Sequence, residues 1–237
     1  ERYGAGFVAH GVGYSVGSAC GADAARRARW RELVSRDDAQ FSFRWYTDHL
    51  GVSSLAGQAA TLPLPLPMTQ EVAGIVRERL LEMQRVVPDV GVENSVFYFA
   101  FGDPLDEPAF LADILSAPRT HLLLDLHNVY TSSRNFGFDP EAYLSRLDLS
   151  RVIEIHVSGG SDSDPRWLAS GRVMRLDGHD GAVPEEVFAL CERWAPRCPR
   201  LRGITLERME GTVTSQRDVD ELSAELDRVR WIAERCR

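Results

Sequence analysis

Six short apolar runs alternate along this 237-residue chain with longer segments that have the residue spacing of helices. An order of strand, helix, strand and helix is typical of a parallel sheet whose strands are joined by crossover helices. Several runs are apolar at nearly every position, as expected of strands that are covered on both faces. The expected strands are residues 6–10, 41–46, 90–93, 121–126, 152–157 and 203–207.

The segments between these runs carry the start signals of helices. Asp139 precedes Pro140, which places a capping residue before a proline at the first helical position. The expected helices are residues 22–34, 70–87, 107–116, 140–147, 184–195 and 215–234.

Two segments interrupt the alternation of strands and helices. Residues 53–68 contain three Leu-Pro pairs, and because proline donates no ladder hydrogen bond this segment cannot be a central strand. We expect an extended loop there, covering part of a barrel mouth. Residues 158–177 are rich in Gly, Ser and Asp, and we expect a long loop or a small hairpin that follows a strand. Long loops inside compact domains are usually functional.

This pattern predicts an α/β fold, namely a TIM-type (β/α)8 barrel, as a single domain over residues 1–237. The chain is long enough for one large core. A closed barrel needs eight strands, whereas the sequence shows six. We therefore expect the first two strands of the barrel to be missing from the N-terminal side of this sequence.

Charge and cysteine usage narrow the class of partner. The formal net charge is −8, which argues against a nucleic acid or an anionic membrane as partner, since both favour a basic face. No apolar stretch reaches the roughly 18 residues of a transmembrane helix. The four cysteines form no CxxC pair and lack the spacing of a disulfide scaffold, so we expect free thiols and a cytoplasmic location.

Every expected strand delivers a metal-capable side chain at or just after its end. These side chains are His10, His49, Glu93, Asp125, His156 and Glu207, and Asp177 and His179 follow the second irregular segment. In a barrel, active sites are built at the carboxyl ends of the strands. Imidazole and carboxylate together form the mixed ligand set of zinc, manganese and non-haem iron. The set is too large for one ion and predicts two or three ions that share carboxylates. His121 stands at the start of its strand, so we interpret it as structural.

The motifs around these residues occur in the order seen in a known family. They are His10-Gly11-Val12-Gly13-Tyr14-Ser15, Asp48-His49-Leu50, Leu62-Pro63-Leu64-Pro65, Val92-Glu93-Asn94, Leu123-Leu124-Asp125-Leu126-His127-Asn128-Val129-Tyr130, Phe136-Gly137-Phe138-Asp139-Pro140, Glu154-Ile155-His156 and Asp177-Gly178-His179. The chain resembles the multinuclear non-haem iron-dependent oxidative enzymes (MNIO), the group that includes the oxidase of methanobactin biosynthesis. The resemblance extends from Ala9 to about Glu207, and members of the family begin with two more strands.

The resemblance implies roles for individual residues. His10, His49 and Glu93 would hold one iron ion, and Glu93 would bridge to a second. The second ion would also be held by Asp125, His156 and Glu207, and a third site would use Asp177 and His179. The expected catalytic residues are Glu93, Asp125 and His156, and the residues expected to orient ligands are Asp48, Asn94 and Asn128.

One position departs from the family pattern. The family usually has a second histidine three residues after the position of His156, where this chain has Gly159. The sequence therefore leaves open whether two or three irons are bound. His127, which stands where many relatives have asparagine, could supply the missing ligand, and Asp162 or Asp164 could supply an oxygen.

The resemblance also implies a reaction. Members oxidise a residue, most often cysteine, of a ribosomally synthesised precursor peptide, using O2 and a mixed-valent Fe(II)/Fe(III) pair, in the biosynthesis of natural products. They commonly need a partner protein that presents the leader peptide. Two alternatives stay open from the residues alone. One is another divalent-metal TIM-barrel enzyme, similar to xylose isomerase or endonuclease IV, and the other is a degenerate barrel that binds without catalysis.

Overall fold

The computed structural model describes residues 6–236, and the chain falls into two compact units. The first unit spans Glu1–Ser95 and Phe99–Leu122, and the second spans Val96–Tyr98 and Leu123–Arg237. We describe each unit by itself. The expectation of a single domain stays a prediction.

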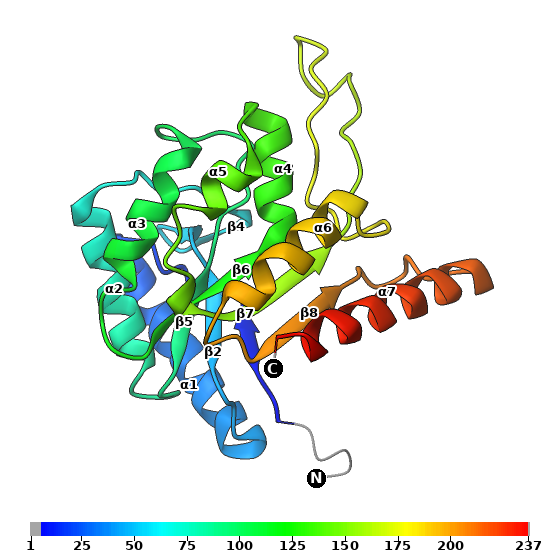
Figure 1. Ribbon diagram of the computed structural model, residues 1–237. Coiled ribbons are helices and arrows are strands. Elements are labelled where there is room, and N and C mark those ends of the chain that lie inside the picture. Colours follow the sequence, from blue (N-terminus) through cyan, green and yellow to red (C-terminus); the bar gives the residue numbers. More distant parts are fainter. Residues whose placement is uncertain (1–5, 237) are drawn as a thin grey trace. The chain divides into compact units, whose positions relative to one another are not determined.

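The first unit is built on parallel strands with helices between them (Figure 1). β1 (Ala9–Gly11) pairs with β2 (Tyr46–His49), and β2 pairs with β5 (Val90–Glu93). The connecting helices are α1 (Ala24–Phe41), α2 (Gln70–Met83) and α3 (Glu107–Ile114), with single 3-10 turns at Gly21–Asp23 and Pro104–Asp106. β6 (Thr120–Asp125) follows β5 in the strand order and passes from the first unit into the second.

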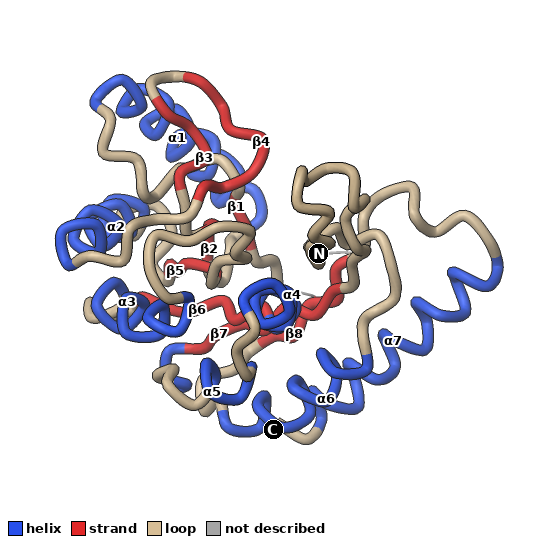
Figure 2. Tube along the Cα trace, turned by 90° about the horizontal axis from the view of Figure 1, so that it is seen from above, coloured by secondary structure: helices blue, strands red, loops and turns tan. Residues whose placement is uncertain are grey.

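We expected residues 53–68 to form an extended loop, but they contain an antiparallel hairpin. It consists of β3 (Val52–Leu55) and β4 (Gln58–Leu64). The turn residues Ala56 and Gly57 have φ values of 51° and 80°, as a two-residue hairpin turn of type I′ requires. Asp23, next to α1, accepts a hydrogen bond from the Gly57 N–H at 2.8 Å, and the hairpin lies beside α1 in Figure 2. The prolines are tolerated because this two-stranded sheet has no central strand.

The second unit pairs β7 (Val152–Ser158) with β8 (Gly203–Glu207) in parallel, after β6 in the strand order. Its helices are α4 (Leu126–Phe136), α5 (Pro140–Leu144), α6 (Glu185–Trp194) and α7 (Gln216–Glu234), with 3-10 turns at Leu149–Arg151 and Ala195–Arg197. β7 is buried at every position, as its apolar sequence predicted for a strand covered on both faces.

Two further elements differ from what the sequence predicted. A strand over residues 41–46 is wrong, because α1 continues to Phe41 and β2 begins only at Tyr46. The apolar character of that run serves ring packing instead, since the rings of Phe7 and Phe41 lie 5.3 Å apart. α4 was not expected. It begins directly after Asp125, whose side chain accepts a hydrogen bond from the Asn128 N–H and so caps the helix.

The sequence predicted a long loop or a small hairpin at residues 158–177; Ser158 ends β7, and residues 159–177 form a long loop, drawn in yellow in Figure 1. Its two arms are joined as in a hairpin, by an isolated bridge between Asp162 and Arg175 and by a hydrogen bond from the Ser163 N–H to the Met174 carbonyl at 2.8 Å.

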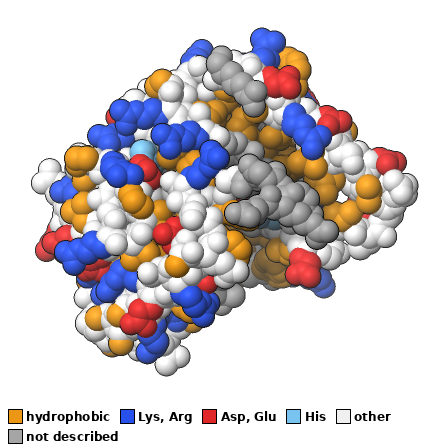
Figure 3. All heavy atoms as spheres, turned by 90° about the horizontal axis from the view of Figure 1, so that it is seen from below, with side chains coloured by type: hydrophobic (Ala, Val, Ile, Leu, Met, Phe, Trp, Pro, Cys, Tyr) orange, Lys and Arg blue, Asp and Glu red, His pale blue; other side chains and the backbone are white. Residues whose placement is uncertain are grey.

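The surface carries charges of both signs. On the face shown in Figure 3, basic and acidic side chains are interspersed with hydrophobic ones. Within residues 6–236, no helix is both long enough and apolar enough to cross a membrane.

Candidate metal centre

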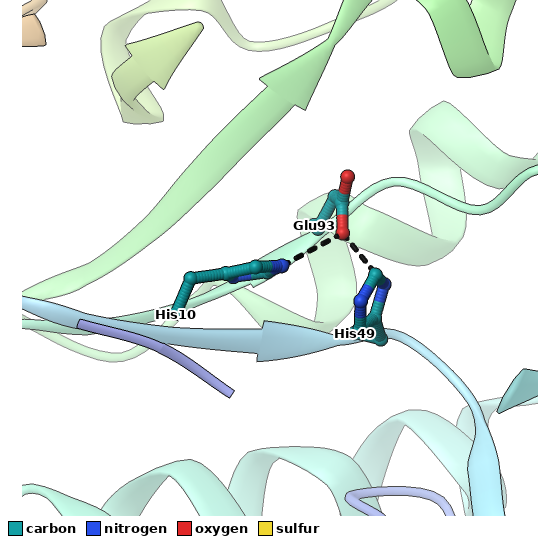
Figure 4. Close-up of side chains that lie close together, drawn as sticks. All are labelled: His10, His49 and Glu93. Atoms are coloured by element: carbon teal, nitrogen blue, oxygen red, sulfur yellow. Dashed lines mark ion pairs between the residues drawn. The ribbon is translucent and has the colours of Figure 1, made fainter. Parts of the chain in front are cut away.

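Three predicted ligands of the first unit lie together, and we call His10, His49 and Glu93 the first cluster. Their strands run in register, so that His49 stands level with Glu93, and both imidazole rings point toward the same carboxylate (Figure 4). His10 Nε2 lies 3.2 Å and His49 Nδ1 lies 2.7 Å from Glu93 Oε2. One ligand atom from each residue lies within 4.8 Å of the other two.

The Glu93 side chain is only 3% exposed. Burial alone would raise its pKa, but the charge of His49 and hydrogen bonds from both histidines hold the pKa of Glu93 well below its usual value. An ionised carboxylate in such a place is costly unless it is paired or bound to a cation.

The donor set of the first cluster fits iron. Two histidines and one carboxylate are the ligands of mononuclear non-haem Fe(II) sites, which keep open positions for substrates. The three ligand atoms already converge, because hydrogen bonds between parallel strands fix the places of their backbones. The same donors also bind zinc and manganese, so the geometry defines a metal site more firmly than it defines the metal.

Residues next to the ligands of the first cluster form two further hydrogen bonds. Thr47, which is level with His10 in the register, places its hydroxyl 2.9 Å from His10 Nδ1, which leaves Nε2 toward Glu93. Asp48 accepts a hydrogen bond from the Tyr46 hydroxyl, and its expected role in orienting a ligand stays a prediction. Burial raises the pKa of Asp48 to about 7, against the lowering effect of that bond. Asn94 is buried directly after Glu93.

The second unit holds another group of predicted ligands, and we call His156, Asp177, His179 and Glu207 the second cluster. Glu207 Oε2 lies 3.2 Å from His156 Nδ1 and 3.7 Å from His179 Nε2. Asp177 Oδ1 lies 3.0 Å from His179 Nε2. A carboxylate oxygen of Asp125 lies within 4.8 Å of a ring nitrogen of His156. Imidazole and carboxylate groups therefore alternate through this cluster.

His127 joins the second cluster from α4. Its Nδ1 lies 2.8 Å from Asp177 Oδ1, and its side chain is fully buried. Burial raises the pKa of Asp177, but hydrogen bonds with His127 and His179 outweigh this and lower it to about 2. From the sequence, His127 could supply the missing ligand, and we expected no helix at this position. The ring reaches Asp177 from a helix instead.

The backbone around Gly159 leaves no room for a side chain. A Cβ atom on Gly159 would lie 2.1 Å from the Ala182 carbonyl oxygen and 2.3 Å from that of Gly181. A Cβ atom on the next residue, Gly160, would lie 2.1 Å from the Leu176 carbonyl oxygen and 3.0 Å from His127 Cε1. The His127 ring thus lies against Gly160, the residue after the position where the sequence departs from the family.

The two aspartates of the long loop are engaged elsewhere. Asp162 is exposed and lies 3.7 Å from the Arg175 guanidinium, and Asp164 accepts hydrogen bonds from Arg166 at 2.9 Å. Their role as extra ligands stays a prediction.

His121 lies at the start of β6, away from the carboxyl ends of the strands. Its Nε2 lies 2.8 Å from Asp89 Oδ1.

The sequence reading missed one buried carboxylate of the second unit. Glu154 Oε1 lies 3.2 Å from His156 Nε2 and accepts a hydrogen bond from the Thr205 hydroxyl at 2.7 Å. A signal was present, because Glu154 is two residues before His156 in an apolar strand, and residues two apart share one face of a strand.

Solved structures with little sequence identity share this fold. A xylose isomerase domain-containing protein from Salmonella typhimurium LT2 aligns with a TM-score of 0.63 at 15% identity, over 97% of this chain and 77% of that one. A xylose isomerase-like TIM barrel from Mycobacterium smegmatis, in complex with magnesium, gives 0.60 at 12% identity, over 99% of this chain and 75% of that one. The fold class is therefore the TIM-type barrel, as the sequence predicted.

The family follows from sequence. Residues 2–234 match the family described as RiPP precursor modification enzyme MbnB/TglH/ChrH. A UPF0276 protein of Caulobacter vibrioides is 35% identical over 95% of this chain and 76% of its own length. A UPF0276 protein of Rhizorhabdus wittichii is 38% identical over 77% of this chain and 62% of its own length. The chain belongs to the MbnB/TglH/ChrH family of RiPP precursor modification enzymes, which confirms the resemblance to the multinuclear iron enzymes.

Proposed function

We propose that this protein is a multinuclear non-haem iron oxidase that uses O2 to modify a residue, most often cysteine, of a ribosomally synthesised precursor peptide. The observation that carries the proposal is the convergence of His10, His49 and Glu93 on one point. The family supports the peptide substrate, and the two-histidine, one-carboxylate set supports iron.

In this proposal each unit contributes part of the metal-binding residues. The first cluster would hold one ion, and Asp125, His156 and Glu207 would hold a second. Asp177, His179 and His127 are the proposed ligands of a third. Bound iron would supply the redox chemistry with O2, cycling between Fe(II) and Fe(III), and the protein would fix its ligands and exclude water.

The proposal is tested by metal analysis of protein purified without oxygen from cells grown on ⁵⁷Fe. We expect two or more irons per chain and a Mössbauer spectrum with a coupled ferrous–ferric pair. A single zinc or manganese ion would contradict the proposal. That result would favour the second candidate, a divalent-metal enzyme, because one barrel of similar fold was solved with magnesium and another with zinc.

The β3–β4 hairpin is our proposed contact for the peptide in the first unit. It follows His49 after two residues and exposes Leu55, Leu62 and Leu64 at 58%, 60% and 41%. The outer side of β3 is engaged, since the Ser15 hydroxyl accepts hydrogen bonds from its backbone N–H groups. Extended peptides bind by adding to a sheet edge, and β4 offers the other edge.

This contact predicts a binding defect without a metal defect. Leu62→Ser should raise the KM for a cysteine-containing precursor peptide and leave the iron content unchanged. Leu81→Ser on α2, where the leucine is 42% exposed, is the matched control and should change neither. Equal KM values for the two variants would remove the hairpin from the proposal. We further propose a leader-binding partner protein, which the same assay would detect as a requirement for turnover.

A further inference from the structure

Glu154 is an acidic residue in the middle of a strand that is buried along its whole length. Its side chain is 3% exposed and shares one face of β7 with His156. Glu154 Oε1 lies 3.2 Å from His156 Nε2. Thr205, which stands level with His156 on β8, donates its hydroxyl to the same carboxylate oxygen at 2.7 Å. The carboxylate is therefore held in place from the neighbouring strand.

This arrangement distinguishes the two ring nitrogens of His156. Each ring nitrogen lies 3.2 Å from a carboxylate oxygen, and His156 can donate a hydrogen bond to Glu154 only when Nε2 carries the hydrogen. In that tautomer the lone pair of Nδ1 points toward Glu207, which is a proposed ligand of the same ion. We propose that Glu154 is a positioning residue that fixes His156 with Nδ1 as its metal-binding atom. The inference deepens the proposed function and rests on the second cluster being a metal site.

The chemistry explains why a carboxylate is tolerated there. A histidine ligand that donates its second N–H to a carboxylate is held in one orientation and becomes a more basic ligand. The cation on the far side of the ring in turn offsets the cost of burying the carboxylate. His10 has a different partner, because the group at its second nitrogen is the neutral Thr47 hydroxyl. The ion at His156 should therefore be stabilised more strongly in its higher oxidation state than the ion at His10.

The test compares metal-free wild type with Glu154→Gln, using Co(II) alone as the probe. We expect Glu154→Gln to weaken binding of the ion at His156 by about 10- to 100-fold, the usual cost of removing a partner of a metal ligand. Binding at the first cluster should be unchanged. The exchangeable, cobalt-shifted proton resonance of the His156 Nε2–H should move and exchange faster with solvent, which a merely structural role would not cause. Glu141→Gln removes a carboxylate paired with Arg193 on the same unit and should behave as wild type.

The outcomes separate the inference from the proposed function. Wild-type affinity and an unchanged proton resonance in Glu154→Gln would overturn the inference while leaving the proposed function in place. Failure of the wild type to bind cobalt at the second cluster would overturn the proposed function and the inference with it. If Glu154→Gln does not fold, as judged by circular dichroism, Thr205→Val takes its place as the test of the inference. It keeps the carboxylate and removes the bond that orients it, so a several-fold loss of affinity at His156 supports the inference, and unchanged affinity overturns it.

Discussion

The first and the second cluster contain similar ligands on different kinds of backbone. His10, His49 and Glu93 all come from paired parallel strands. In the second cluster, His156 and Glu207 come from strands, but Asp177 and His179 come from a loop that has no regular structure. His179 has a left-handed backbone with φ of 51°, which is uncommon for a residue other than glycine.

The difference lies in what fixes each ligand. Ladder hydrogen bonds set the places of the first three ligands, and these bonds would persist without any ion. The loop ligands are held by contacts of individual residues and not by a strand ladder. The Met209 N–H donates to the His179 carbonyl at 2.8 Å, and the Asp177 N–H donates to the Tyr98 hydroxyl at 2.9 Å. We therefore expect the first cluster to be preorganised and the second to be ordered in part by its ions.

The largest expected effect tests the first cluster. Glu93→Gln removes the charge on which both histidines converge. Loss of an outer partner, meaning a group that is hydrogen-bonded to a metal ligand, weakens metal binding by up to roughly 100-fold, and loss of the Glu93 charge should weaken it more. Cobalt titration of metal-free protein measures this, with Glu141→Gln as the control. Full metal content in Glu93→Gln would show that Glu93 is not a ligand.

The strand ends were the part of the site that sequence could predict. In a parallel sheet the carboxyl ends of strands lie at one edge, so apolar runs that end in His10, Glu93 or His156 place ligands without knowledge of any contact. The residues behind the ligands were harder to find. Thr47 and Glu154 have partners set by the register between strands, and register cannot be derived from one strand alone.

In three places the secondary structure differs from the one that the sequence pattern predicted, because of local contacts. The run at residues 41–46 has the composition of a strand, but the α1 helix and its ring contacts include Phe41. The Leu-Pro repeat conceals β4, because an outer strand tolerates proline. α4 begins without a break after β6, because Asp125 serves both as a candidate ligand and as the helix cap.

The second prediction tests how rigid the surroundings of the second cluster are. Gly159→His puts the family's histidine at this position, but its Cβ would lie 2.1 Å from the Ala182 carbonyl oxygen. We expect no additional bound ion and a loss of about 1–3 kcal/mol in the free energy of unfolding, the usual cost of overpacking. Gly159→Ala should show a similar loss in urea unfolding. Gly181→Ala is the control, because its Cβ would lie 3.6 Å from the Gly160 carbonyl oxygen. An added ion in Gly159→His, without loss of stability, would show that the backbone around Ala182 moves at little cost in free energy.

The third prediction concerns acid stability of the metal-free protein. The pKa of Asp177 is lowered from 3.8 to about 2 in the folded chain, so its ionised form stabilises the fold. This contribution is fully present above pH 3.8 and disappears as the pH falls toward 2. It is on the order of 2 kcal/mol, at 1.36 kcal/mol per pKa unit. Asp177→Asn should therefore be less stable than wild type at pH 6, and the difference should narrow below pH 3.8. A difference that is constant between pH 6 and pH 3 would contradict the charged interaction with His127 and His179.

The smallest expected effect returns to the first cluster and compares the two kinds of outer partner. Thr47→Val removes the hydroxyl 2.9 Å from His10 Nδ1 and keeps the shape of the side chain. We expect about a tenfold loss of cobalt affinity at the first cluster, at the low end of the range for outer partners, because the lost group is neutral. Thr47→Ser keeps the hydroxyl and should retain wild-type affinity.

Oxidation state separates the two outer partners further. Replacing the neutral hydroxyl of Thr47 leaves the charge around the first ion unchanged, so the reduction potential of that ion should stay close to the wild-type value. Glu154→Gln removes a negative charge beside the second ion and should raise its potential, because the ferric form loses more stabilisation than the ferrous form. Protein-film voltammetry of the iron-loaded variants measures both. Equal shifts in the two variants would mean that Thr47 and Glu154 act only by orienting their histidines, and that the carboxylate adds no electrostatic effect of its own.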